Sequence, residues 1–484
     1  MSSERSNPAA SAKSHAGRAG SDRIRSRWFA GRASRRTAVR SAWLLAGFVA
    51  VLLARQASWS HAAEPRSADP PAVRRFVFRY RFQLVHLDRF LQQHRSTDGD
   101  KTVRIWIPLA RSTRFQHVVS AFPEPAAPAD SSAVSARAGA ASAVDSRSRR
   151  GSARARLVEL HWDEATTETF RRDNPVRLPG PARVLRDPEF GNRVLFVEVR
   201  PQDPSRPVTI EIPYCVARQE VRSRDLDALP AEKLSDVERR LFLRANSKVP
   251  VGGKPLSLLQ GIPLHRKNPL QLARDLYQVV EANLTYKKVG SGWGRGDVLW
   301  VCDSRYGNCT DFHSLFISLA RAQGIPAKFV IGFPVPREPA SGAIGGYHCW
   351  AWFFAEGRGW RPVDISEADK HPELKGYYFG NLTADRIQFT TGRDIDLNRL
   401  VCEAAEPRRR REGVEPQEAD GRSRPDCAAP RSVAPPLNYF IYPHVEVAGR
   451  VLDQKFISLQ MSYCNVDADC LCAAAETKRG RRVD

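Results

Sequence analysis

The sequence lacks several patterns that would place a chain in a function class at once. No two cysteines have the Cys-x-x-Cys spacing, which argues against a structural zinc site. The apolar run at residues 42–54 has only 13 residues, whereas a membrane span needs about 20. The glycine-rich segment 290–296 follows no strand pattern and has no Lys-Ser or Lys-Thr ending, which argues against a phosphate-binding loop.

The chain has few acidic residues for its size. Lys and Arg number 75 against 53 Asp and Glu, for a formal net charge of +22. Most of this excess is arginine in segments of low hydrophobicity, and no ordered platform of basic and aromatic residues is present to bind nucleic acid. We therefore expect no nucleic-acid partner, and 484 residues suffice for about two or three domains.

The N-terminal residues have the composition of an export signal. Residues 1–40 are rich in Ser, Arg, Ala and Gly and predict a disordered basic leader. Residues 41–63 predict a signal peptide or anchor, because an apolar run follows arginines and precedes the small-residue cleavage site Ser-His-Ala at 60–62. We expect export to the periplasm or cell envelope, with membrane contact only through an uncleaved N-terminal segment. The nine cysteines permit disulfides without showing them.

The rest of the chain predicts a β-rich domain followed by an α+β domain. Phe76, Phe78, Tyr80 and Phe82 alternate with other residues, as in the strands of an antiparallel sandwich. The expected order is a β-sandwich-like domain at 75–225 with a disordered insertion at 126–154, a catalytic domain at 226–402, a disordered insertion at 403–435, strands completing the catalytic domain at 436–464, and a tail at 465–484.

Cys309 stands where a helix is expected to begin. Phe312, Leu315, Phe316 and Leu319 recur at helical spacing after it, and a glycine and a proline at 324 and 326 end the pattern. Unpaired N–H groups and the positive end of the helix dipole favour the thiolate form of a cysteine at that position. Cys309 is therefore a candidate nucleophile.

A base and an orienting acid follow in chain order. His348 lies 39 residues after Cys309 in the buried-strand pattern 346–354, and Asp364 lies 16 residues later at the end of the returning strand. On such a hairpin the carboxylate holds the imidazole tautomer, which is the arrangement needed for acyl transfer through a thioester. His313, four residues after Cys309, is a rival base. Strand alternation turns Cys349 away from His348, so we expect it to fill the core.

Four ordered motifs resemble the core of the transglutaminase-like superfamily, whose fold is that of papain-like cysteine proteases. They are Gly-Asn-Cys-Thr-Asp at 307–311, Arg-Ala-Gln-Gly-Ile-Pro-Ala-Lys at 321–328, His-Cys-Trp at 348–350, and Gly-Trp at 359–360 with Asp364. The resemblance implies a helix carrying the cysteine packed on an antiparallel sheet, with Cys309 as nucleophile, His348 as base and acid, and Asp364 as orienter.

The same resemblance implies an aromatic donor upstream for the oxyanion, for which Tyr286 and Trp293 are the candidates, and no cofactor or metal. Asn308 and Thr310 stand where crosslinking animal transglutaminases have Gln and Trp. The prediction is therefore an exported cysteine hydrolase or acyltransferase acting on amide bonds of a protein or peptide. Glutamine–lysine crosslinking, and an envelope binding or assembly protein with an idle site, are the alternatives. Substrate identity and oligomeric state stay open.

Overall fold

A computed structural model describes residues 71–94, 100–124, 160–230, 232–403 and 430–466. The expected leader, the signal peptide or anchor and the insertion at 126–154 lie outside the described residues. So do nearly all of the tail and most of the insertion expected at 403–435. Within the described ranges, no helix combines the length and the apolar character that crossing a membrane requires.

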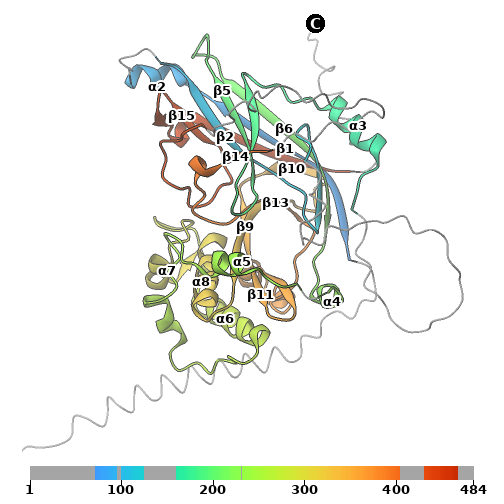
Figure 1. Cartoon of the computed structure of the whole chain (residues 1–484), viewed down its shortest axis with the longest axis vertical. Coiled ribbons are helices and arrows are strands. Elements are labelled where there is room, and N and C mark those ends of the chain that lie inside the picture. Colours follow the sequence, from blue (N-terminus) through green and yellow to red (C-terminus); the bar gives the residue numbers. More distant parts are fainter. Residues whose placement is uncertain (1–70, 95–99, 125–159, 231, 404–429, 467–484) are drawn as a thin grey trace, which may run out of the picture. The chain divides into compact units, whose positions relative to one another are not determined.

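The described chain is an α+β structure built around antiparallel sheets, which confirms the expected fold class (Figure 1). We call the four-stranded sheet the central sheet, since it carries the candidate site. Its order is β12-β11-β9-β13, with bounds β9 Ala327–Pro334, β11 His348–Ala355, β12 Gly359–Val363 and β13 Arg386–Thr391.

Two larger sheets are formed mainly by the N-terminal half. The five-stranded sheet has the order β10-β17-β1-β6-β3, with bounds β1 Val73–Leu84, β3 Gln116–Val119, β6 Val208–Gln219, β10 Ser341–Ile344 and β17 Ile457–Asn465. The six-stranded sheet has the order β14-β4-β5-β2-β15-β16, with bounds β2 Val103–Leu109, β4 Ala182–Arg186, β5 Arg193–Val199, β14 Val401–Cys402, β15 His444–Val447 and β16 Arg450–Val451. A short parallel pair joins β7 Thr285–Tyr286 to β8 Tyr306–Gly307.

The two longest helices of the described chain, α6 and α8, lie in its second half. The bounds of the helices are α2 Leu87–Gln93, α3 Glu164–Asp173, α4 Ser223–Asp227, α5 Asp236–Leu243, α6 Pro269–Asn283, α7 Val298–Ser304, α8 Cys309–Ala322 and α9 Ile365–Lys370. Short 3-10 turns lie at η1 Lys254–Leu259, η2 Pro372–Leu374, η3 Leu397–Arg399 and η4 Gln454–Phe456. Helix α6 begins with the Asn268 side chain accepting the N–H of Gln271 and with a proline at the first helical position.

The central sheet is covered on both faces. Phe115, which directly precedes β3, stacks on Trp352 of β11 with ring centroids 6.0 Å apart, so the five-stranded sheet borders one face. Helix α8 covers the other face, where Phe316 and Phe353 of β11 lie 6.1 Å apart. All described residues belong to one compact unit. The domain limits at 75–225 and 226–402 stay predictions.

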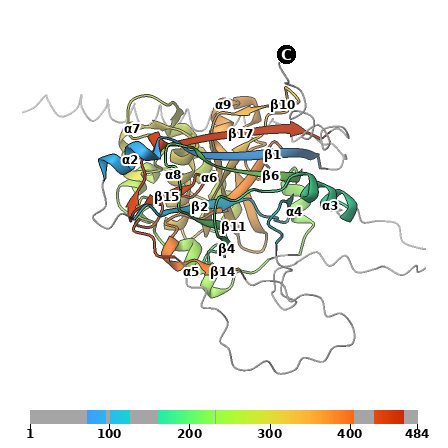
Figure 2. The ribbon, with the colours of Figure 1, turned by 90° about the horizontal axis from the view of Figure 1, so that it is seen from above.

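The strands in the segment 436–464 pair outside the central sheet, and their assignment to the catalytic domain stays a prediction. Strand β17 pairs with β1 and β10, and β15 pairs with β2 (Figure 2). Alternation alone predicts a strand but not its partner, because an edge donates the same hydrogen bonds to any neighbour. The C-terminal strands instead extend the two sheets begun by the N-terminal strands.

The outer edge of β13 is closed by two side-chain amides rather than by another strand. Gln116 accepts from the N–H of Gln388 at 2.8 Å and donates to its carbonyl at 3.0 Å. Asn192 does the same for Thr391, at 2.8 Å in both directions. Both amide side chains are fully buried, so these bonds replace water that the edge would otherwise need.

Replacing Gln116 with methionine is expected to lower the free energy of unfolding by about 3 kcal/mol, because it leaves a buried N–H and a buried carbonyl of β13 without partners. Equilibrium urea unfolding measures this loss. The matched control is Gln92→Met on the exposed side of α2, which should change stability by less than about 0.5 kcal/mol. Equal effects of the two substitutions would contradict the role given to Gln116.

Candidate active site

Cys309 is the first residue of helix α8, as the sequence predicts. Asn308 is the N-cap: its side chain accepts the N–H of Thr310 at 2.9 Å, while Asp311 accepts the N–H of Asn308 at 2.9 Å. These reciprocal bonds form a capping box and fix the first turn. Cys309 is 2% exposed, so its sulfur lies in a buried site at the positive end of the helix dipole.

The glycine-rich segment 290–296 is bound to this helix start. Asp311 accepts the N–H groups of Gly294 at 2.6 Å and Gly296 at 2.9 Å. Gly296 has a φ of +59°, and a Cβ there would lie 2.3 Å from the Ser314 oxygen, so only glycine fits. The segment therefore forms a wall beside Cys309, held by the buried carboxylate of Asp311.

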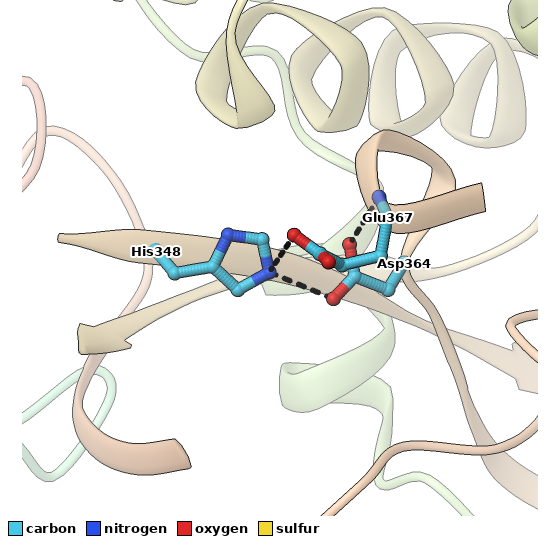
Figure 3. Close-up of side chains that lie close together, drawn as sticks. All are labelled: His348, Asp364 and Glu367. Atoms are coloured by element: carbon cyan, nitrogen blue, oxygen red, sulfur yellow. Dashed lines mark hydrogen bonds and ion pairs between the residues drawn. The ribbon is translucent and has the colours of Figure 1, made fainter. Parts of the chain in front are cut away.

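His348 and Asp364 form a buried ion pair on neighbouring strands (Figure 3). His348 begins β11, and Asp364 follows β12 as the N-cap of α9. The distance from His348 Nε2 to Asp364 Oδ2 is 2.7 Å, and the two residues are 6% and 0% exposed. A side-chain hydrogen bond also joins His348 to Cys309. Since Nε2 is taken by the carboxylate, Nδ1 is the nitrogen left for the sulfur.

The charges in this cluster stabilise one another. Burial opposes the thiolate of Cys309, but hydrogen bonds from Cys349 and His348 and the positive charge of His348 hold its pKa well below the ordinary range. Burial likewise opposes the imidazolium of His348, yet Asp364 and Cys309 raise its pKa to about 10. His348 and Arg386 lower the pKa of Asp364 despite its burial. The site therefore favours a thiolate–imidazolium pair at neutral pH.

Arg386 of β13 is a further member that the sequence did not reveal. Its Nη1 lies 2.8 Å from Asp364 Oδ2, and its guanidinium lies 5.0 Å from the ring centroid of Trp350. The Trp350 ring is in turn 6.2 Å from that of His348, on the same strand face. Arg386 is 3% exposed. The carboxylate is thus held between an imidazole and a guanidinium, both screened from water.

The rival base His313 has both ring nitrogens engaged elsewhere. Nε2 accepts the backbone N–H of Ile365 at 3.0 Å, which requires an unprotonated nitrogen, and the ring also hydrogen-bonds the backbone of Cys309. Burial is the main cause that lowers the pKa of His313. The geometry therefore gives His313 the position of a neutral bridge between α8 and α9, with no nitrogen directed at the Cys309 sulfur.

Cys349 is fully buried, as expected, but it also contacts the candidate site. Its Sγ lies 3.7 Å from Thr310 Oγ1 and 3.7 Å from His313 Nδ1, and it hydrogen-bonds Cys309. Alternation does turn Cys349 to the other strand face from His348, but that face is the one covered by the first turn of α8. The pKa of Cys349 is raised mainly by burial and also by the Cys309 thiolate. Cys349 therefore remains a thiol that can donate a hydrogen bond.

The two predicted oxyanion donors differ in their surroundings. Burial raises the pKa of the Tyr286 hydroxyl, and the charge of Cys309 adds to this. The indole N–H of Trp293 donates to the carbonyl of Gly290 at 3.2 Å within its own loop. Tyr286 therefore remains available as a donor, whereas the single donor of Trp293 is occupied.

Tyr347 is another residue that was missed, although it directly precedes His348. Its hydroxyl lies 3.1 Å from Asn308 Nδ2, 3.0 Å from Thr310 Oγ1 and 3.4 Å from the carbonyl of Gly294. It therefore connects the strand that carries the base to both neighbours of Cys309 and to the glycine-rich wall.

His348, Asp364 and Glu367 also form a group with metal-ligand chemistry, since their ligand atoms lie within 4.8 Å of one another. His348 Nε2 is 3.9 Å from Glu367 Oε1 (Figure 3). A cation there would displace the Nε2 proton that Asp364 holds, and it would face the guanidinium of Arg386 at the same carboxylate. The surroundings suit a proton better than a metal ion, and the absence of a metal requirement stays a prediction.

Comparisons with known proteins give a family match and a sequence relative. Residues 257–365 match the family model of the Transglutaminase-like superfamily. An uncharacterised protein of Haemophilus influenzae is 27% identical over 256 residues, which are 46% of this chain and 61% of that protein, so the match spans less than two thirds of the relative.

Two solved structures are also similar. A proposed cysteine protease from Cytophaga hutchinsonii is 13% identical, with 82% of this chain and 92% of that chain covered and a TM-score of 0.40. The periplasmic domain of TgpA from Pseudomonas aeruginosa is 16% identical, with 60% and 95% covered and a TM-score of 0.25. At these TM-scores neither structure supports a conclusion about activity.

Removing the thiol of Cys349 is expected to raise the pKa of Cys309, because the thiolate loses a buried hydrogen-bond donor. In Cys349→Ala, iodoacetamide labelling of Cys309 at acidic pH should slow by about tenfold, the value of a hydrogen bond to a charged group. Labelling rates from pH 4 to pH 9, read by mass spectrometry of the Cys309 peptide, measure the shift. Cys349→Ser keeps a donor and should restore most of the rate. Unchanged labelling in Cys349→Ala would refute the contact.

Proposed function

Because the chain carries the core of the transglutaminase-like superfamily, we propose that it is a cysteine hydrolase that cleaves amide bonds of a protein or peptide through a Cys309 thioester. The observation that supports this most directly is the buried chain of contacts from the Cys309 sulfur to His348 and on to Asp364. A sulfur, an imidazole and a carboxylate in this order are the elements of nucleophilic acyl transfer.

The proposed acylation begins from the ion pair. The Cys309 thiolate attacks the amide carbonyl carbon, and the carbonyl oxygen becomes an oxyanion. The backbone N–H of Cys309 and the Tyr286 hydroxyl are the proposed donors to this oxygen. His348 then gives its Nδ1 proton to the leaving amine, the carbon–nitrogen bond breaks and a thioester remains. Asp364 keeps its own charge throughout and stabilises the imidazolium while it exists.

Deacylation reverses the role of the base. Neutral His348 takes a proton from water, the hydroxide attacks the thioester carbonyl, and the carbon–sulfur bond breaks to release a carboxylic acid and the Cys309 thiolate. A primary amine in place of water would instead give a new amide, which is the crosslinking alternative. Water is favoured because Asn308 and Thr310 occupy the positions that hold Gln and Trp in the crosslinking pattern. Both bond Tyr347 in this chain.

Export is part of the proposal. Cys402 and Cys464 each take part in a disulfide, and disulfides persist in oxidising compartments such as the periplasm. Cys215, Cys302, Cys309 and Cys349 are free, so the thiol proposed for catalysis is not consumed by a structural bridge. The signal-like run at 42–54, which lies outside the described residues, is consistent with the same route.

Hydrolysis and amine transfer are separated by one experiment. The protein is incubated with a glutamine-rich protein and a fluorescent primary amine, and peptide and carboxylate products are quantified by mass spectrometry. We expect hydrolytic products to exceed amine incorporation, and Cys309→Ala to lose at least about a thousandfold in rate. The matched control Cys302→Ala, a buried cysteine of α7, should retain activity.

The other outcomes identify the alternatives. Amine incorporation exceeding hydrolysis would assign crosslinking. No turnover, together with alkylation of Cys309 no faster than in the unfolded chain, would favour a binding or assembly protein with an idle site.

The pH profile tests the role of Asp364. Acylation needs the imidazolium proton, so wild-type kcat/KM should persist until pH rises through about 10, the pKa to which Asp364 and Cys309 raise His348. In Asp364→Asn this alkaline limit should move to lower pH, because removing the carboxylate lowers the pKa of His348. The rate at pH 7 should also fall by about a thousandfold. Glu373→Gln, an exposed carboxylate of η2, is the control. An unmoved alkaline limit in Asp364→Asn would exclude the pair as the catalytic dyad.

A further inference from the structure

A cavity of about 340 Å³ lies on the face of the central sheet opposite helix α8. Lys328 of β9, Trp352 of β11 and Trp360 of β12 contribute to its wall, together with Phe115 and Phe242 from neighbouring segments. Its size falls within the range of small-molecule pockets, about 300–1,000 Å³. Trp352 lies four residues beyond His348 on β11, which separates their backbones by about 13 Å. The cavity is therefore distinct from the candidate active site.

Lys328 is the unusual group in this cavity. Its Nζ lies 3.9 Å from the ring centroid of Trp360, 5.7 Å from that of Phe242 and 5.8 Å from that of Trp352. These rings attract the cation by their faces but accept no ordinary hydrogen bond. In the described part of the chain, no carboxylate or carbonyl lies within bonding distance of the ammonium. The pKa of Lys328 is lowered to about 8, mainly because the ammonium is buried.

Arg111 supplies a second cation, and one of its N–H donors has no acceptor among the described residues. Its Nη1 donates to the carbonyl of Gly191 at 2.8 Å, but its buried Nε has no hydrogen-bond partner among the described residues. Arg111 and Lys328 both line the cavity, and neither forms an ion pair with a described carboxylate. Buried donors without acceptors are costly, so an acceptor entering the cavity would remove an existing penalty.

The remaining charges restrict the kind of anion. Glu232 neutralises Arg114 at 2.9 Å, and Arg244 neutralises Glu189 at 2.6 Å, so Glu238 is the carboxylate without a cation partner among the described residues that line the cavity. The two unpaired cations, Lys328 and Arg111, and the unpaired Glu238 leave one net positive charge, which a singly charged anion matches better than a doubly charged phosphate. The aromatic walls, with Phe115 and Trp352 stacked at 6.0 Å, suit an apolar body behind that charge.

We propose that this cavity binds a molecule that joins a single carboxylate to an aromatic or branched apolar body, with the carboxylate on the Lys328 ammonium. A small organic acid and the C-terminal residue of a peptide share this chemistry. The site is independent of the thioester chemistry proposed above, since none of its residues contacts Cys309, His348 or Asp364 in the described structure.

The test measures binding by isothermal titration calorimetry to the full chain carrying Cys309→Ala, so that no peptide is processed. The probes are 3-phenylpropionate, the peptide acetyl-Gly-Gly-Phe with a free C-terminus, and the same peptide as its C-terminal amide. We expect at least one free acid to bind, and the peptide acid to exceed its amide by about tenfold if a chain terminus is the source. Binding of 3-phenylpropionate alone assigns a small acid.

Two variants at Lys328 test the contact. Lys328→Met keeps the length and apolar stem but removes the charge, and should weaken acid binding by about tenfold or more. Lys328→Arg keeps the cation and its contact with the rings, and should retain most of the affinity. Near-ultraviolet circular dichroism establishes that both variants are folded.

Acid binding measured at different pH values tests the contact in the protein that keeps Lys328. The acid must be ionised and Lys328 protonated, so affinity should fall as pH rises through about 8. The other charged groups facing Lys328 are Arg111, Arg114, Glu189, Glu232 and Glu238, and carboxylates and guanidiniums ordinarily titrate far from pH 8. Absence of acid binding at millimolar concentration, or full affinity in Lys328→Met, would overturn the proposal.

Discussion

The buried carboxylate of Asp364 is the constraint on which the rest of the site depends. A carboxylate with no solvent exposure is unfavourable unless cations and donors surround it. His348 and Arg386 supply the cations, and the hydroxyl of Ser366 adds a donor at 3.2 Å. The same carboxylate stabilises the imidazolium, and the imidazolium stabilises the Cys309 thiolate. Removing the central charge would therefore lower the pKa of His348 and weaken its stabilisation of the Cys309 thiolate.

This cluster forms because β11 and β13 begin at the same edge of the central sheet at which β12 ends. His348, Asp364 and Arg386 come from β11, the end of β12 and β13, so their approach depends on the register of the central sheet. The sheet is held between α8 and the five-stranded sheet, and its open edge is closed by Gln116 and Asn192. The N-terminal strands therefore do more than precede the site, since they cover one face of the sheet that builds it and shape the cavity around Lys328.

Much of the candidate site was predictable from local patterns. Helical spacing and a glycine–proline ending placed Cys309 at a helix start, and two apolar runs separated by a turn placed His348 and Asp364 on a hairpin. Arg386 and Tyr347 were not predictable in this way, because a lone arginine or tyrosine carries no periodic signal. The contact of Cys349 with the site was not predictable, since alternation tells which face a side chain takes but not what covers that face.

The sequence by itself determined the elements: where helix α8 begins, which segments alternate as strands, and which residue types stand at their ends. These follow from backbone preferences and apolar periodicity, which act over a few residues. Only the tertiary structure decided which strands pair, that 444–465 return to the N-terminal sheets, and that Cys349 and Arg386 meet the site. Those contacts join residues far apart in the chain, and they form because buried rings, charges and strand edges must all find partners at once.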